Sequence, residues 1–217
     1  MLKIFLLGPF QLIRDQTPVP ETAWHTRQAR QLLKILLTYR GQIVPRDTLI
    51  DALWPDADPD KAATTLRTAV NALRNSLEPA RPPYTPSRFI VAHAPGYKFQ
   101  FSEQVWVDAI AFEALLEQAA SAPDLPRRQS LLEQAVALYR DDFLCGDPYA
   151  DWAAFERDRL LDCYLGALTD LADCQVKQGS TGRAIAGLRR VLSRDPGREP
   201  VYRTLMRHYL HLGNTVA

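Results

Sequence analysis

The sequence predicts a mainly α-helical protein with small β elements, in which a three-helix module closed by a β-hairpin precedes an all-helical repeat domain. Three observations support this prediction. Residues 58–100 encode a polar-faced helix that is followed at once by a short hairpin around Pro95-Gly96-Tyr97. From Val107 onward, helical periodicity is nearly continuous. A 34-residue self-similarity runs through the last part of the chain.

The two halves of the chain differ in charge. Residues 1–101 carry 13 Lys and Arg against 8 Asp and Glu, a net of +5, and residues 102–217 carry 13 against 17, a net of −4. A basic module joined to an acidic one fits a nucleic-acid-binding domain attached to a domain of another kind. We place the first domain at residues 1–101, a short linker at 102–106 and the second domain at 107–217.

Composition argues against several classes of protein. No apolar run approaches the roughly 20 residues of a membrane span. The apolar start at residues 1–8 is too short for a signal peptide and leads into Pro9 without a small-residue cleavage site. The three cysteines lack the spacing of a disulfide framework or a zinc site. We therefore expect a cytoplasmic protein without membrane contact, metal or cofactor; nucleoid association is expected only with the DNA binding considered below.

The first elements are predicted from local signals. Residues 2–13 are rich in β-forming side chains and predict a hairpin or small sheet that continues to Val19. The first helix is expected to begin after Thr26, whose hydroxyl suits the N-cap, and to end at Gly41. A second, short helix is predicted over residues 46–54, because its apolar residues recur at helical spacing.

The third helix has a strong start signal, because Asp58 can cap it, Pro59 suits its first position and Asp60 favours the positive end of its dipole. A clean apolar stripe predicts its inward side. Its opposite side presents only basic and small polar residues, namely Thr64, Thr65, Arg67, Thr68, Asn71, Arg74 and Asn75. No acid occurs between Lys61 and Leu77.

Such a helix side is suited to reading DNA bases in the major groove. Arginine and asparagine can make bidentate hydrogen bonds to guanine and adenine edges, and threonine can touch the thymine methyl group. The candidate base-reading residues are Thr64, Arg67, Thr68, Asn71, Arg74 and Asn75. A plain solvated helix would normally mix charges of both signs, but a polar surface helix without a ligand remains the alternative.

The hairpin that follows supplies a second candidate DNA contact. One strand is predicted over 89–91, and the next carries Tyr97 and Phe99 in alternation after the Pro95-Gly96 turn. A hairpin placed directly after a recognition helix can lie along the DNA backbone or enter the minor groove. The residues assigned to backbone and wing contacts are Arg27, Arg46, Arg88, His93 and Lys98.

Residues 2–101 together resemble the winged-helix DNA-binding domain of the OmpR/PhoB class, and more narrowly that of the SARP-type (antibiotic regulatory) bacterial activators. The matching stretches are Leu7-Gly8-Pro9-Phe10, Gln42-Ile43-Val44-Pro45-Arg46, Leu49-Ile50-Asp51-Ala52-Leu53-Trp54, Thr65-Leu66-Arg67-Thr68-Ala69-Val70-Asn71-Ala72-Leu73-Arg74 and Pro95-Gly96-Tyr97. The resemblance implies that the third helix enters the major groove and that the wing contacts the backbone. The family commonly has Arg where this chain has His93, and a neutral histidine neutralises no phosphate.

The second half is predicted to be all-helical, with a long helix over about 152–177, a helix over about 182–193 and another from near Glu199. The self-similarity aligns three pairs of residues: Gly179 with Gly213, Leu171 with Leu205, and Leu168 with Tyr202. This spacing is typical of a tetratricopeptide-like helical repeat. Such repeats stack into a concave surface for partners.

The SARP-type resemblance extends through this half, to the bacterial transcriptional activation domain. It is carried by Val107-Asp108-Ala109-Ile110-Ala111-Phe112-Glu113, Leu138-Tyr139-Arg140 and Trp152-Ala153-Ala154-Phe155-Glu156-Arg157-Asp158-Arg159-Leu160. It implies an activator that binds double-stranded DNA at repeated promoter sites, in side-by-side copies, and helps recruit RNA polymerase. Because the chain ends at Ala217, in the middle of a further repeat, we expect a longer protein; the alternative is a last helix that acts as a cap.

No catalytic constellation stands out, and we expect no enzyme activity. His208 and His211 lie three residues apart but lack an obvious acidic or cysteine ligand, and no phosphate-cradling loop or nucleophile elbow occurs. Two alternatives to a DNA-binding regulator remain open. One is a helical-repeat adaptor whose winged helix mediates only protein contacts, and the other is the effector portion of a larger signalling protein. The uniformly basic third helix favours DNA.

Overall fold

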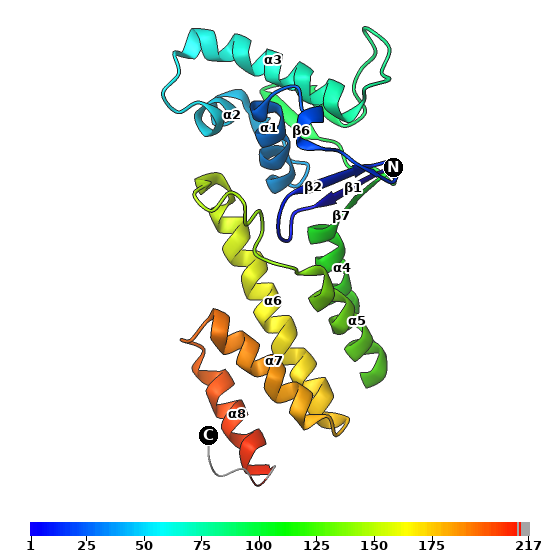
Figure 1. Ribbon diagram of the computed structural model, residues 1–217, viewed down its shortest axis with the longest axis vertical. Helices are drawn as coiled ribbons and strands as arrows, with labels where there is room; N and C mark the ends of the chain where they lie inside the picture. The colour runs from blue at the N-terminus through cyan, green and yellow to red at the C-terminus, as the bar shows by residue number, and fades with distance from the viewer. Residues whose placement is uncertain (212, 214–217) are drawn as a thin grey trace. The chain divides into compact units, whose positions relative to one another are not determined.

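The computed structural model describes residues 1–211 and 213, and it confirms the predicted fold class: a winged helix is followed by helical hairpins (Figure 1). The chain forms two compact units. The first contains Met1–Ile4, Gln11–Trp106 and Asp147–Glu156, and the second contains Phe5–Phe10, Val107–Gly146 and the chain from Arg157 onward. The predicted boundaries treat each half as one continuous stretch, whereas in the structure two short segments are exchanged between the halves.

The N-terminal elements, most of them in the first unit, build two small sheets and three helices. They are β1 (Leu2–Phe5), β2 (Gln11–Arg14), β3 (Thr17–Pro18), the 3-10 helix η1 (Glu21–Ala23), α1 (Arg27–Thr38), β4 (Val44–Pro45), α2 (Arg46–Leu53), α3 (Pro59–Leu77), β5 (Ile90–His93), β6 (Gly96–Phe99) and β7 (Val105–Val107). One sheet has the order β3-β2-β1-β7, and the other has the order β4-β6-β5.

The start of α1 and the inward side of α3 are as predicted. The Thr26 hydroxyl accepts a hydrogen bond from the backbone N–H of Ala29 at 3.0 Å, which caps α1. Helix α3 begins at Pro59, and its apolar stripe is buried against α1 and α2. The buried residues of the stripe are Leu66, Ala69, Val70, Leu73 and Leu77. Burial of this stripe directs the polar side of α3 to solvent.

The wing is the antiparallel pair β5 and β6, which β4 extends on the β6 side. Pro45 of β4 lies opposite Gly96 of β6. A Cβ added to Gly96 would lie 1.7 Å from the Val44 carbonyl oxygen. The turn therefore needs glycine at this position, because the backbone of β4 occupies the space of any side chain.

The segment Asp147–Glu156 belongs to the first unit through two ion pairs with the α1 region. The Lys34 ammonium lies 2.6 Å from the Asp147 carboxylate, which also accepts a hydrogen bond from Gln31 at 3.1 Å. The Arg40 guanidinium donates from Nε to Glu156 at 2.7 Å. Lys34 and Glu156 are buried. These contacts join residues more than 110 positions apart in the sequence, and no local pattern predicts them.

The C-terminal elements are all helical. They are α4 (Asp108–Ala120), α5 (Leu125–Leu138), α6 (Asp151–Lys177), α7 (Thr181–Arg194) and α8 (Glu199–His211). Within the second unit α4 packs against α5, and α7 packs against α8. Asp108 begins α4 and is buried. Its carboxylate accepts backbone N–H bonds from Leu6 at 2.7 Å, Leu7 at 3.0 Å and Ala109 at 2.8 Å, which ties the segment Phe5–Phe10 to this unit.

The 34-residue repeat is confirmed in the backbone conformation. Gly179 follows α6 with φ of +78° and Gly213 follows α8 with φ of +72°, a region that glycine adopts without steric cost. Each donates its N–H to the carbonyl three residues earlier, at 2.9 Å and 3.1 Å respectively. Leu171 and Leu205 are both buried, whereas Leu168 is buried and Tyr202 is exposed. The predicted end of the repeat at Ala217 lies outside the described residues.

Candidate nucleic-acid interface

The outer side of α3 presents the predicted base-reading residues to solvent. Five of the six side chains are exposed: Thr64, Arg67, Thr68, Asn71 and Asn75. Within the part of the chain that the structure describes, the Arg67 guanidinium has no hydrogen-bond or ion-pair partner. An unengaged guanidinium on a helix side without acids is available for a guanine edge or a phosphate.

The threonines on this side use their hydroxyl hydrogens inside the helix. Thr65 donates to the Lys61 carbonyl at 3.0 Å, and Thr68 donates to the Thr64 carbonyl at 3.2 Å. Such bonds to the preceding turn are common for threonine in helices. They leave the hydroxyl lone pairs and the methyl group for a ligand. Thr68 is therefore better suited to contact a thymine methyl group than to donate a hydrogen bond to a base.

Arg74 differs from the other five, because its side chain turns toward the wing. It is half-buried, and its Nε and Nη2 atoms donate to the Ile90 carbonyl oxygen at 3.2 Å and 3.0 Å. Burial lowers the pKa of the Arg74 guanidinium from its ordinary value, although an arginine stays protonated at neutral pH. The observed contact fastens β5 to α3. Base reading by Arg74 remains a prediction that competes with this contact.

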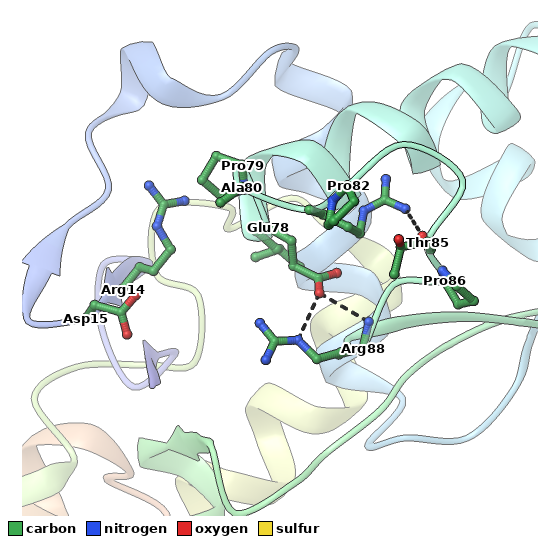
Figure 2. Close-up of a pocket in the computed structure, with 11 residues that line it drawn as sticks. Arg14, Asp15, Glu78, Pro79, Ala80, Pro82, Thr85, Pro86 and Arg88 are labelled. Carbon is green, nitrogen blue, oxygen red and sulfur yellow. Dashed lines mark hydrogen bonds and ion pairs between the residues drawn. The ribbon is translucent and has the colours of Figure 1, made fainter.

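A buried carboxylate that sequence analysis did not identify connects the end of α3 to the start of the wing. Glu78 follows α3 and accepts hydrogen bonds from the backbone N–H and Nε of Arg88, at 3.3 Å and 3.2 Å (Figure 2). It also accepts a hydrogen bond from the Ser87 hydroxyl. The Ser87 hydroxyl in turn accepts the N–H groups of Phe89 and Ile90. This network sets where β5 begins. Its signal in the sequence is that Glu78 interrupts an otherwise basic stretch.

The predicted backbone-contacting residues occupy different places in the first unit. His93 is exposed on the wing, where its Nδ1 lies 3.0 Å from the Ala94 carbonyl oxygen. Lys98 is half-buried on β6, and the exposed Arg46 donates its backbone N–H to Pro95 at the wing turn, at 3.4 Å. The structure thus brings Arg46 and the wing together.

The other two assigned cations are placed differently. Arg88 is engaged by Glu78, and its guanidinium also lies 5.5 Å from the centroid of the Phe89 ring. Arg27 begins α1 and lines a separate hollow of about 240 Å³ that also includes Trp152. Neither residue lies on the outer side of α3 or on the wing strands, so their assignment to phosphate remains a prediction.

The charge balance of this region is strongly one-sided. Residues 61–102 contain six Lys and Arg residues and a single acid, Glu78, which is buried and engaged. No acid of this stretch is therefore exposed beside the basic and amide groups of α3. A surface of one sign attracts a polyanion, and such attraction depends on ionic strength.

Two family models match the chain. The model described as "Bacterial transcriptional activator domain" matches residues 107–217, and "Transcriptional regulatory protein, C terminal" matches residues 21–99. The first match covers more than half of the chain, and the protein belongs to the bacterial transcriptional activator domain family, in its SARP-type arrangement with an OmpR/PhoB-type winged helix.

Several curated relatives match almost the whole chain. Regulatory protein AfsR of Streptomyces coelicolor is 30% identical over an alignment of 208 residues, which covers 94% of this chain and 20% of AfsR. Transcriptional regulatory protein EmbR of Mycobacterium tuberculosis is 29% identical over an alignment of 213 residues, which covers 94% of this chain and 52% of EmbR. Regulatory protein DnrI of Streptomyces peucetius is 27% identical and is covered to 76% of its length. The chain thus spans about a fifth of AfsR and about half of EmbR.

A solved structure of a relative has the same fold. The structure described as Mycobacterium tuberculosis EmbR in complex with low affinity phosphopeptide superimposes with a TM-score of 0.82 at 27% identity, covering 98% of this chain and 55% of that one. None of the described helices is long and apolar enough to cross a membrane. Nor do the described residues bring three or more metal-binding side chains together.

Proposed function

We propose that this chain is a sequence-specific DNA-binding transcriptional regulator, in which the outer side of α3 reads the major groove and the wing contacts the backbone. The main supporting observation is the exposed side of α3 that carries Arg67 and Asn71. Residues 61–102 contain one acid, Glu78, and its side chain is buried. Membership of a transcriptional activator family and the regulator names of the relatives support the same function.

Within this proposal the six candidates on α3 divide into two groups. Thr64, Arg67, Thr68 and Asn71 are exposed and face the ligand directly. Arg74 is a positioning residue that holds β5 through Ile90, and Asn75 is exposed but accepts a hydrogen bond from Arg81 at 3.3 Å. Direct reading by the first group fits the chemistry of arginine, asparagine and threonine at base edges.

The test is a selection of genomic DNA fragments by the purified chain at low and at physiological salt. Enrichment of one repeated sequence motif that survives the higher salt would support the proposal, because non-specific phosphate contacts weaken steeply as salt rises. Salt-sensitive binding without a motif would refute it and would favour the protein-contact adaptor.

We further propose that the helical-repeat domain activates transcription by contacting RNA polymerase while copies of the chain occupy side-by-side sites. An exposed apolar row on α8 supports a protein-binding role: Tyr202, Met206 and Leu210 recur every four residues. A gel-shift assay with RNA polymerase and the selected DNA tests this role. Met206→Glu should abolish the ternary complex and leave DNA binding intact; a ternary complex of unchanged stability would contradict the role.

A further inference from the structure

A proline-rich loop follows α3 and presents a fully exposed aromatic side chain. The loop spans residues 79–88 and contains four prolines. Figure 1 shows it projecting beyond the C-terminal end of α3, away from α1 and α2. Tyr84 has an exposed fraction of 105% and a φ of +61°. A non-glycine residue in this conformation carries a conformational cost, and such residues cluster at functional sites.

The loop is held in place although it is exposed. The Arg81 guanidinium donates to the Thr85 carbonyl at 2.5 Å, and the Thr85 N–H donates to the Pro82 carbonyl at 3.2 Å, so that the turn carrying Tyr84 is closed from both sides. At the base of the loop, the Ser87 hydroxyl donates a hydrogen bond to Glu78, and Glu78 also accepts hydrogen bonds from Arg88 (Figure 2). Because prolines and these bonds restrict the loop before any ligand arrives, little further ordering is needed for binding.

The loop lies beside the outer side of α3. Arg81 donates from Nη2 to the Asn75 side-chain oxygen at 3.3 Å, which links the loop to the last exposed polar residue of the helix. A hollow of about 300 Å³ beside the loop is lined by Arg14, Arg81 and Arg88 and also by the acids Asp15 and Glu78. Figure 2 shows Arg14, Asp15, Glu78 and Arg88 around it. The loop itself contains no acid. The basic surface of α3 therefore continues onto the loop.

We propose that Tyr84 is a further DNA-binding residue, whose hydroxyl donates a hydrogen bond to a backbone phosphate at the edge of the groove that α3 reads. This inference rests on the proposed function. A polyanion bound along α3 would pass the loop, since Arg81 bridges the two, and tyrosine is among the side chains that contact phosphate oxygens in protein–DNA interfaces. The contact positions the duplex and carries no sequence information. Because the phenol is neutral, it displaces no counterion.

The test is Tyr84→Phe, compared with the wild-type chain for binding to the selected site and to a scrambled duplex over a range of salt. We expect binding about 2- to 10-fold weaker on both duplexes. The slope of log K against log salt should stay unchanged, unlike that of Lys98→Ala. Tyr149→Phe is the matched control, because Tyr149 is 95% exposed but lies in the segment joined to α1. Hydroxyl-radical footprinting should show lost protection at one end of the site.

Each result decides the inference. If the wild-type chain selects a DNA motif and Tyr84→Phe binds the selected site with unchanged affinity, the inference is overturned and the proposed function stands. An altered salt slope for Tyr84→Phe would also overturn it, because a neutral hydrogen bond cannot release a counterion. A wild-type chain that selects no DNA motif would overturn the proposed function and this inference together. Unfolding in urea should be the same for both tyrosine variants, since neither side chain is buried.

Discussion

Arg67 and Arg74 stand two turns apart on α3, and their different surroundings predict different effects of mutation. Arg67 is exposed and without a partner among the described residues, so Arg67→Ala should change the free energy of unfolding by no more than about 0.5 kcal/mol. If its guanidinium reads a base, the same change should reduce discrimination between the selected and a scrambled site by about 1–3 kcal/mol, or roughly 5- to 150-fold.

Arg74→Ala should act through the fold. Two N–H groups of one guanidinium share the Ile90 carbonyl oxygen at 3.0 Å and 3.2 Å, so they count as a single charged interaction. Hydrogen bonds to charged groups contribute about 1.5–3 kcal/mol, and partial exposure places this one toward the lower end, at about 1.5–2 kcal/mol. Loss of the bond frees β5 from α3, so DNA affinity should fall on both duplexes by a similar factor.

The assay combines urea unfolding with competition binding for four variants of these two arginines. Arg67→Lys and Arg74→Lys are matched controls, because lysine keeps the charge but lacks the planar fork of N–H donors. Arg67→Lys should retain affinity for scrambled DNA while losing discrimination. The reasoning would be refuted if Arg74→Ala lost discrimination at unchanged stability, or if Arg67→Ala lost stability at unchanged discrimination.

Three other predictions concern the wing and the second unit. Gly96→Ala should lower the free energy of unfolding in urea by at least about 2 kcal/mol, because the new Cβ would lie 1.7 Å from the Val44 carbonyl oxygen. Gly146→Ala is the control and should leave the free energy of unfolding unchanged, because its Cβ meets nothing within 4 Å. Equal losses for the two variants would contradict the argument. His93→Arg should tighten DNA binding and steepen its salt slope by about 0.9, measured by fluorescence anisotropy, whereas an unaltered slope would place the residue off the backbone. Asp108→Ala should lower the free energy of unfolding by about 3 kcal/mol or more, since it removes the acceptor of three buried N–H groups. In the same urea assay, Asp124→Ala removes only an exposed helix cap and should lower it by about 1 kcal/mol. Similar losses for the two variants would refute the role of Asp108.

The elements that sequence analysis predicted well are those whose signals are local. Thr26 caps α1 and Pro59 opens α3, because the preferences for these positions depend on a few neighbouring residues. The repeat was detectable because Gly179 and Gly213 meet the same backbone requirement at the end of a helix. Helical periodicity predicts which side of α3 is exposed, and it therefore predicts Arg67 and Asn71 as candidate base-reading residues.

The features that sequence analysis missed depend on which residues meet in space. Base reading by Arg74 stays a prediction, but no local pattern indicated that its guanidinium also donates to the Ile90 carbonyl oxygen, 16 residues away. In the sequence Glu78 is an isolated acid, whereas in the structure its carboxylate accepts hydrogen bonds from Ser87 and Arg88. Periodicity assigns a side chain to one side of a helix but cannot say which partner occupies that side.

The order of the helices and hairpin, the repeat and the basic character of α3 are all predictable from local sequence, since propensity, capping and charge are properties of neighbouring residues. The inclusion of Asp147–Glu156 in the winged-helix unit becomes visible only when the chain is folded. That placement depends on the pairing of Lys34 with Asp147 across 113 positions of the chain. A buried charge is costly unless it is paired, and its partner can come from any part of the chain that the fold brings close. Such a pair produces no periodic pattern in the sequence.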